Sequence, residues 1–210
     1  MTSTWRRLAA ALVSDLRLIF ASRLRSVVAY GPRVEEDADV PLACLALVES
    51  LGVADLEACA RRASQWRRQG LATPLLLPDH EFRRSLDAFP LEYGEIIRAH
   101  ELVEGPDPFG HASIAPDDLR RACETQVKSH LLHLRESFIE SSGHPHGIAQ
   151  LVTASAPAFA ALLRNVARLN GCATTDRAEA TRDGARAAGL AEGVVTDVLA
   201  LERKIGRAHV

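Results

Sequence analysis

The sequence predicts an α+β protein, in which a small mixed sheet with flanking helices is followed by an antiparallel helical bundle. In the first half, short apolar runs alternate with amphipathic helical patterns, which is typical of a sheet with helices packed on it. The turn formers of Gly105–Gly110 separate this half from a second half in which only helical patterns occur. We therefore expect an α/β domain over residues 1–112 and a helical domain over 113–210.

Each element of the first half has its own signal. Apolar residues recur at helical spacing from Leu8 to Phe20 and predict an opening helix. Apolar runs predict strands at 24–30, 42–48 and 75–77, and the first of these ends at a Gly-Pro turn. Asp55 and Asp79 are expected to begin the helices between and after these strands. The segment 89–97 is predicted to be a fourth strand.

The second half is predicted to contain four helices. Pro116, with two aspartates directly behind it, is expected to start the first long helix. A second long helix is expected over 148–169, where Pro157 should cause a kink or a break. Asp176 with Glu179 resembles a capping pair for the third helix, and the fourth is expected near 191–204. Short connections between such helices favour an antiparallel bundle.

Composition excludes several classes of protein. Apolar residues make up 47% of the 210 residues and charged residues 25%, so the chain can bury a core. The formal net charge is −2, and no excess of Lys and Arg indicates nucleic acid or a membrane surface. No uninterrupted apolar run approaches the ~18 residues of a membrane span. The four cysteines form no CxxC pair and suit a reducing compartment, so we expect a cytoplasmic protein.

The run from Leu24 to Val48 carries the most functional information. A helix, an apolar strand, Tyr30-Gly31, an acidic loop and a second apolar strand follow one another. This order resembles the nucleotidyltransferase superfamily. In that family, a Gly-Ser pair contacts nucleotide phosphates, an Asp-x-Asp pair holds two divalent metals and a later carboxylate completes the site. Alternate residues of a strand point to the same side, so Asp-x-Asp directs two carboxylates to one place.

By this resemblance, Gly31, Pro32 and Arg33 are the expected nucleotide-binding residues. Asp37 and Asp39 have the spacing of the metal-binding pair, and Glu92 is the expected third carboxylate, for which Glu95 is an alternative.

The chain departs from the family pattern in two ways. Pro32 replaces the serine and offers neither an N–H nor a hydroxyl group. The aspartates precede the second strand instead of starting it, and a solvated acidic loop is the interpretation that we favour for residues 35–39 over an intact two-metal site.

The resemblance extends to the rest of the chain. Phe89–Tyr93, His100–Pro108 and Leu132–Arg135 look like bacterial proteins that pair this domain with a helical one, as kanamycin-type nucleotidyltransferases do. The first hypothesis is a protein with a lost or weakened metal site that binds nucleotide or a partner. The second is an active, Mg²⁺-dependent enzyme that transfers a nucleoside monophosphate to a hydroxyl. The third is a helical interaction module, and the expected partners are a nucleoside triphosphate and a second copy of the chain.

Overall fold

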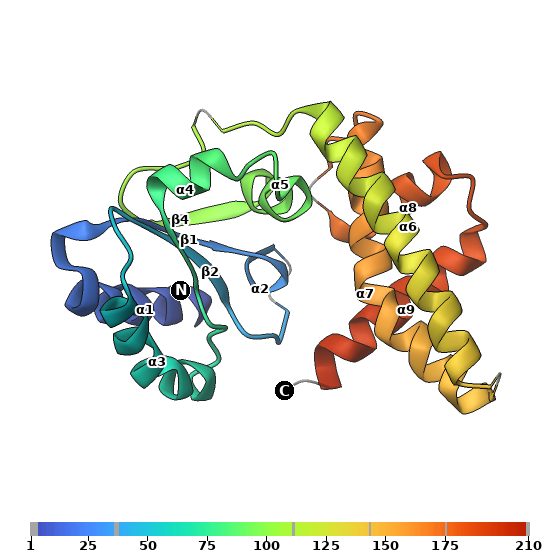
Figure 1. Ribbon diagram of the computed structural model, residues 1–210, viewed down its shortest axis with the longest axis horizontal. Helices are drawn as coiled ribbons and strands as arrows, with labels where there is room; N and C mark the ends of the chain where they lie inside the picture. The colour runs from blue at the N-terminus through green and yellow to red at the C-terminus, as the bar shows by residue number, and fades with distance from the viewer. Residues whose placement is uncertain (1–3, 36–37, 111, 143, 175, 209–210) are drawn as a thin grey trace. The chain divides into compact units, whose positions relative to one another are not determined.

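The computed structural model describes residues 4–35, 38–110, 112–142, 144–174 and 176–208, with residues 202–208 described by their backbone alone (Figure 1). The chain forms two compact units, Met1–Ile114 and Ala115–Val210. The first unit is built around a sheet, and the second is built of helices. Together they give the α+β architecture that the sequence predicts.

The sheet of the first unit has four strands in the order β3-β2-β1-β4. Their bounds are Leu24–Tyr30 for β1, Ala43–Val48 for β2, Leu75–Pro78 for β3 and His100–Glu104 for β4. β1 runs antiparallel to both of its neighbours, whereas β2 and β3 are parallel. At the end of β1, Tyr30 is paired with Ala43 on one side and with His100 on the other. The sheet is therefore mixed, as expected.

Helices cover both faces of this sheet (Figure 1). One face packs against α1 (Thr4–Phe20) and α3 (Val53–Arg68), and its strand residues include Ala29 and Cys44. On the other face, Val28 and Leu45 pack with residues of α4 (Asp79–Arg84) and α5 (Pro90–Arg98). A single 3₁₀ turn, η1 (Ala21–Arg23), joins α1 to β1. Since successive strand residues point to opposite faces, the apolar runs of β1 and β2 supply both cores at once.

The prediction of a strand over 89–97 was wrong. The segment forms α5, with Pro90 at the start of the helix, where proline is well tolerated. Tyr93 and Ile96 are buried at helical spacing, while Glu92 faces solvent. The fourth strand is instead β4, which directly follows α5. The burial of Tyr93 and Ile96 on one face of a helix thus decided the structure of this segment, although its aromatic residues favoured a strand.

One smaller expectation also differs from the structure. The polar loop expected after β1 begins with a short helix, α2 (Pro32–Glu35). Of the two effects expected of Pro157, the break does not occur, because Pro157 lies inside α7 (Pro145–Leu169), and the kink stays a prediction. The Asp176 cap is confirmed, because the Asp176 side chain accepts a hydrogen bond from the backbone N–H of Glu179 at 2.7 Å.

The second unit packs around α7. Its other helices are α6 (Pro116–Glu140), α8 (Arg177–Ala187) and α9 (Glu192–Ala208). All three of these helices contact α7. The contact with α8 is close, because a Cβ atom added at Gly184 would lie 1.8 Å from the carbonyl oxygen of Leu163. Among the described helices, α7 alone has the length and apolar composition of a membrane-spanning helix, and length and composition are the only grounds for that comparison.

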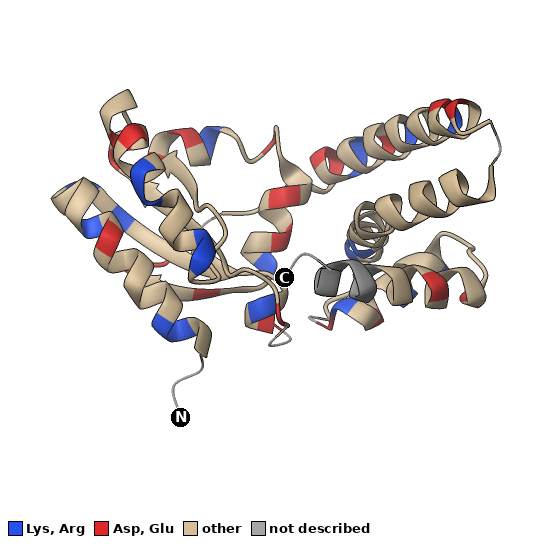
Figure 2. Cartoon of the chain, turned by 90° about the horizontal axis from the view of Figure 1, so that it is seen from below, with Lys and Arg blue, Asp and Glu red and all other residues tan. Residues whose placement is uncertain are grey.

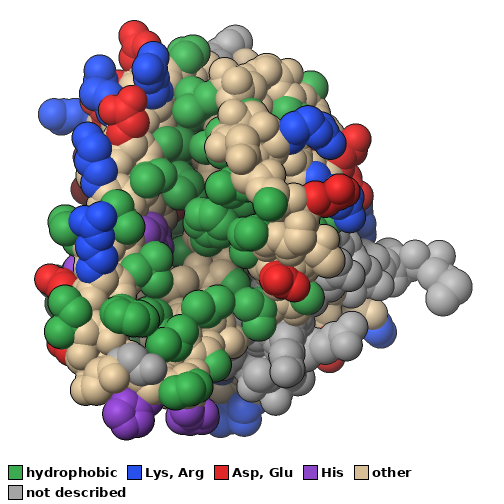
Figure 3. All heavy atoms as spheres, turned by 90° about the vertical axis from the view of Figure 1, so that its right-hand side faces the viewer, with side chains coloured by type: hydrophobic (Ala, Val, Ile, Leu, Met, Phe, Trp, Pro, Cys, Tyr) green, Lys and Arg blue, Asp and Glu red, His purple; other side chains and the backbone are tan. Residues whose placement is uncertain are grey.

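Apolar side chains of the second unit remain exposed along α6 and at the start of α7. Figure 3 shows apolar side chains gathered on this side of the molecule. The exposed ones are Val127, Leu131, Leu132, Phe138, Ile139 and Val152. Acidic and basic residues are interspersed along α6, whereas α7 carries few charges (Figure 2). The helical unit therefore presents an apolar surface flanked by charges of both signs.

Candidate functional site

The turn after β1 is the first part of the candidate site. Gly31 has a φ of +85°, a conformation that glycine adopts without strain. Its carbonyl oxygen accepts the backbone N–H groups of Val34 at 2.9 Å and Glu35 at 3.1 Å, which closes the turn into α2. An added Cβ atom at Gly31 would meet no heavy atom within 4 Å, so the turn is open on this side. Pro32, the next residue, has no N–H to offer a phosphate.

Arg33 holds the two ends of the loop after β1 together. Its Nη1 donates a hydrogen bond to the carbonyl oxygen of Val40 at 2.7 Å. The same nitrogen would lie 3.9 Å from a Cβ atom added at Gly70, the residue that closes the α3–β3 turn. Leu42 in turn donates its N–H to the Gly70 carbonyl at 2.8 Å. The Arg33 hydrogen bond thus holds Val40 close to α2, and the Leu42 hydrogen bond joins the end of the loop to the α3–β3 turn.

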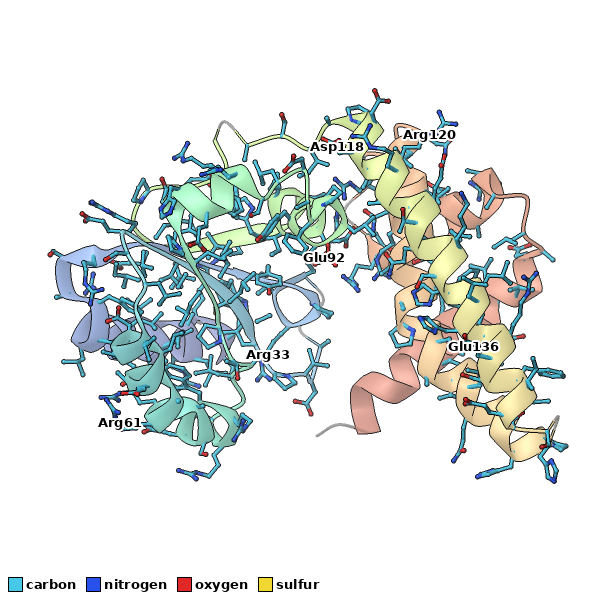
Figure 4. All side chains as sticks on the ribbon, in the orientation of Figure 1. Arg33, Arg61, Glu92, Asp118, Arg120 and Glu136 are labelled. Carbon is cyan, nitrogen blue, oxygen red and sulfur yellow. The ribbon has the colours of Figure 1, made fainter. Side chains whose placement is uncertain are left out.

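The three expected carboxylates do not form a described cluster. Asp39 is exposed in the loop between α2 and β2, and Glu92 is exposed on α5. Figure 4 labels Glu92 on α5 and Arg33 on α2, two separate elements of the first unit. Asp37 lies outside the described residues. Within the described part of the chain, no three His, Cys, Asp or Glu side chains gather where they could hold a metal ion.

Strand β2 supplies no carboxylate to either face of the sheet. Its sequence is Ala-Cys-Leu-Ala-Leu-Val, and every residue after Ala43 is buried. Cys44 has the only side chain in this strand that could bind a metal. Burial raises the pKa of the Cys44 thiol to about 12, which opposes the thiolate form that binds metals. Strand β2 is therefore part of the apolar core.

Beside the turn, three charged side chains meet instead. A single nitrogen of Arg98, Nη2, lies 3.2 Å from Oε2 of Glu35 and 3.6 Å from Oε2 of Glu95. The side chains are largely enclosed, with exposed fractions of 16% for Arg98, 12% for Glu35 and 21% for Glu95. Glu35 ends α2, whereas Glu95 and Arg98 lie one turn apart on α5. We call these three residues the Arg98 triad.

The described residues do not fit a two-metal site. Mg²⁺ binds carboxylate oxygens at about 2.1 Å in near-octahedral geometry. The two glutamates of the Arg98 triad both contact a guanidinium nitrogen, and β2 carries no carboxylate. Among the described residues, no further His, Cys, Asp or Glu side chain joins these two glutamates to form a group of three that could hold a metal ion.

The edge of the sheet next to Gly31 carries further polar groups. Burial raises the pKa of the Tyr30 phenol. Opposite Tyr30, His100 stacks edge-on against Phe109 with ring centroids 4.5 Å apart. Its Nδ1 lies 3.2 Å from the Ile97 carbonyl and its Nε2 lies 3.5 Å from Asp107 Oδ1. These contacts fix the orientation of the imidazole beside the turn.

Arg98 is the residue that sequence reasoning missed. Glu35 was placed in an acidic loop, and Glu95 was considered as a third carboxylate, but neither was connected with an arginine. Glu95 and Arg98 are three residues apart, so they become neighbours only in a helix. Because 89–97 was predicted to be a strand, this spacing carried no meaning. A helical assignment starting at Pro90 would have indicated the pair.

The four-stranded mixed sheet with helices on both faces, followed by a helical unit, is a nucleotidyltransferase-like fold. The chain is similar to a solved structure, the crystal structure of spectinomycin adenyltransferase AAD(9) from Enterococcus faecialis with ATP and spectinomycin. The two share 12% sequence identity at a TM-score of 0.61, over 94% of this chain and 88% of that chain. This likeness establishes the fold alone. No protein-family model matches the chain, and no curated protein matches it in sequence.

Proposed function

We propose that this chain is a nucleotidyltransferase-like protein with a lost or weakened two-metal site, which binds a nucleotide without transferring part of it. One observation carries the proposal: β2 places only apolar side chains and the protonated Cys44 thiol where metal ligands would be needed. The open side of the Gly31 turn supports binding of a phosphate-bearing ligand nearby. That the similar structure was solved with ATP suggests the nucleotide to test first.

Calorimetric titration with ATP tests this function directly. The full chain is titrated in Mg²⁺ and again in EDTA, together with the variant Asp37→Ala/Asp39→Ala. We expect ATP to bind in both solutions, with dissociation constants within about threefold of each other and of the variant's. Because ligands of a required metal cannot be removed without loss, Mg²⁺-dependent binding that the variant abolishes would overturn the proposal. It would favour the active enzyme, in which Asp37, Asp39 and Glu92 hold Mg²⁺.

The exposed apolar side chains of α6 favour a second function, in which the helical unit binds a partner. This helix carries five exposed large apolar side chains, among them Leu131 and Phe138. Contiguous exposed apolar surface is typical of protein–protein contacts. A second copy of the chain is the partner to test, by light scattering of the wild type and of Leu131→Asp/Phe138→Asp. A dimer that the variant abolishes would support this function, and a monomeric wild type up to about 100 µM would contradict self-association.

A further inference from the structure

The C-terminal end of α7 carries an asparagine directly before a glycine, Asn170 and Gly171. Both residues are exposed, and Gly171 has a φ of +81°, the left-handed conformation that commonly ends a helix. The N–H of Gly171 donates to the Arg168 carbonyl at 3.0 Å. The N–H of Cys172 donates to the Ala167 carbonyl, also at 3.0 Å. These two hydrogen bonds form a Schellman motif, which we call the α7 cap.

An asparagine that precedes a glycine is open to attack by its own backbone, because glycine has no Cβ atom to hinder the approach. The Gly171 nitrogen loses its proton to a base in the solvent and forms a bond to Cγ of Asn170. The Cγ–Nδ2 bond breaks, and the amide group leaves as ammonia. The resulting succinimide ring takes up one water molecule and opens to aspartate or isoaspartate at position 170. Water is therefore the only co-reactant of this deamidation.

The α7 cap opposes deamidation in three ways. The N–H proton of Gly171 is held by the Arg168 carbonyl and is shielded from base. Nδ2 of Asn170 donates to the Val166 carbonyl at 2.8 Å, which keeps the amide turned toward the helix. The ψ of Asn170 is 14°, so the backbone nitrogens of Asn170 and Gly171 are nearly eclipsed. Ring closure instead requires Cβ of Asn170 to eclipse the Gly171 nitrogen, so the backbone must first rotate.

We propose that Asn170 and Gly171 form a self-modification site of the chain, at which deamidation proceeds only while the α7 cap is open. Exposed helix ends open locally at a much lower cost in free energy than the core of a protein does. Deamidation in the native protein is therefore slower than in an unfolded chain, but it is not prevented. This inference goes beyond the proposed nucleotide binding and does not depend on it, because the α7 cap belongs to the helical unit.

Deamidation alters the helix that every other helix of the second unit contacts. A carboxylate at position 170 replaces the Nδ2 donor beside the Val166 carbonyl, and it lies at the negative end of the helix dipole. Isoaspartate also adds a methylene group to the backbone, which displaces the N–H groups of Gly171 and Cys172 from their acceptors. Both products weaken the α7 cap, so the modification favours further opening and is not reversed by refolding.

Peptide mapping by mass spectrometry tests the inference on the full chain. The protein is incubated at pH 8.5 in water enriched in ¹⁸O, which labels only the conversion that occurs before digestion. Trypsin then releases Asn170 in the peptide 169–177 and Asn165 in the peptide 165–168. We expect Asn170 to convert in the native protein at least about fivefold more slowly than in 6 M guanidinium. Asn165, the other asparagine of the chain, is buried and precedes a valine, so it should remain unchanged.

Two variants complete the experiment. Asn170→Gln keeps an amide group but does not form the five-membered ring, so the converted peptide should disappear. Asn170→Asp imitates one product and should lower the Tm by about 2 °C or more, because it places a negative charge at the end of α7. An unchanged Tm would contradict the effect on the α7 cap.

The rates decide whether the α7 cap controls the reaction. Equal rates in the native and the denatured protein would overturn the proposal, because the cap would then give no protection. The unfolded fraction of the native protein is measured by urea unfolding. A native rate no higher than the denatured rate multiplied by this fraction would place the reaction in the globally unfolded chain, and it would overturn the proposal as well.

Discussion

Arg23 and Asp55 are joined by two hydrogen bonds, from Nη2 to Oδ1 at 2.7 Å and from Nη1 to Oδ2 at 2.9 Å. This contact connects the residue before β1 to the first turn of α3. Asp55 Oδ2 also accepts the backbone N–H of Gly52 at 3.0 Å and so caps the helix. The Arg23 hydrogen bonds, followed by that of Gly52, lower the pKa of Asp55 from 3.8 to about 2.

This pKa shift predicts how stability depends on pH. A lowered native pKa stabilises the fold fully above the ordinary value of 3.8, and the stabilisation is lost as the pH falls toward 2. We therefore expect Asp55→Asn to be less stable than the wild type at pH 7 and the difference to shrink between pH 4 and pH 2. Urea unfolding at several pH values measures it. Asp87→Asn, an exposed site, is the control, and a difference that stays constant down to pH 2 would contradict the prediction.

The close contact of α8 with α7 at Gly184 leaves no room for a larger side chain. Gly184→Ala should destabilise this unit by about 3 kcal/mol or more, because its Cβ would lie 1.8 Å from the Leu163 carbonyl and α8 would have to move away from α7. Thermal unfolding followed by circular dichroism measures the change. Gly193→Ala on α9 meets no atom within 4 Å and should stabilise by up to ~1 kcal/mol, since alanine favours a helix. Similar effects of the two substitutions would refute the close contact.

The hydrogen bond between Trp66 of α3 and Asp15 of α1 is expected to contribute to the stability of the fold. Its indole Nε1 donates a hydrogen bond to Asp15 Oδ2 at 2.8 Å, and the ring is buried. Trp66→Phe should lower the free energy of unfolding by about 2 kcal/mol, because it removes a hydrogen bond to a charged acceptor. Trp5→Phe removes a buried indole that stacks with Arg6 and should cost less. Denaturant titration compares the two, and equal losses would argue against the role of Asp15.

The cysteines predict an order of reaction with iodoacetamide at pH 8. Cys172 is half-buried and its Sγ lies 3.2 Å from Asp183 Oδ2, whereas Cys44 is buried with its pKa raised to about 12. The thiolate is the reactive form, so Cys172 should be alkylated at least about tenfold faster than Cys44 in the native protein. Mass spectrometry of the peptides measures both rates. The two alkylation rates should become equal in 6 M guanidinium. Equal rates without denaturant would contradict the burial of Cys44.

Much of the fold could be predicted because its signals are local. The apolar runs of β1, β2 and β3 are bounded by turn formers, and α1, α6 and α7 show helical periodicity over many residues. The segment around α5 could not be assigned, because nine residues with two glutamates and a glycine satisfy a strand and a helix almost equally. Only packing of Tyr93 and Ile96 against Phe82 and Phe109 makes the helix the better solution.

The candidate site was less predictable than the fold. The departures at Pro32 and in β2 are visible in the sequence, because proline lacks an N–H and the strand carries no acid. The active-enzyme hypothesis requires Asp39 and Glu92 to converge with Asp37, and the structure describes Asp39 as exposed in a loop and Glu92 as exposed on α5. The roles of these three carboxylates remain a prediction, and the Asp37→Ala/Asp39→Ala variant tests two of them.

The sequence by itself determined the α+β class, the mixed sheet and the absence of acidic residues from the second strand, since each depends on residues that are neighbours along the chain. Only the tertiary structure decided that Arg98 contacts both Glu35 and Glu95. Glu35 and the helix that carries Arg98 are separated by two strands and two helices, and no local pattern specifies which acid meets which base over that distance. Packing of α5 against the sheet fixes the pairing, because it brings the arginine to the turn where β1 ends.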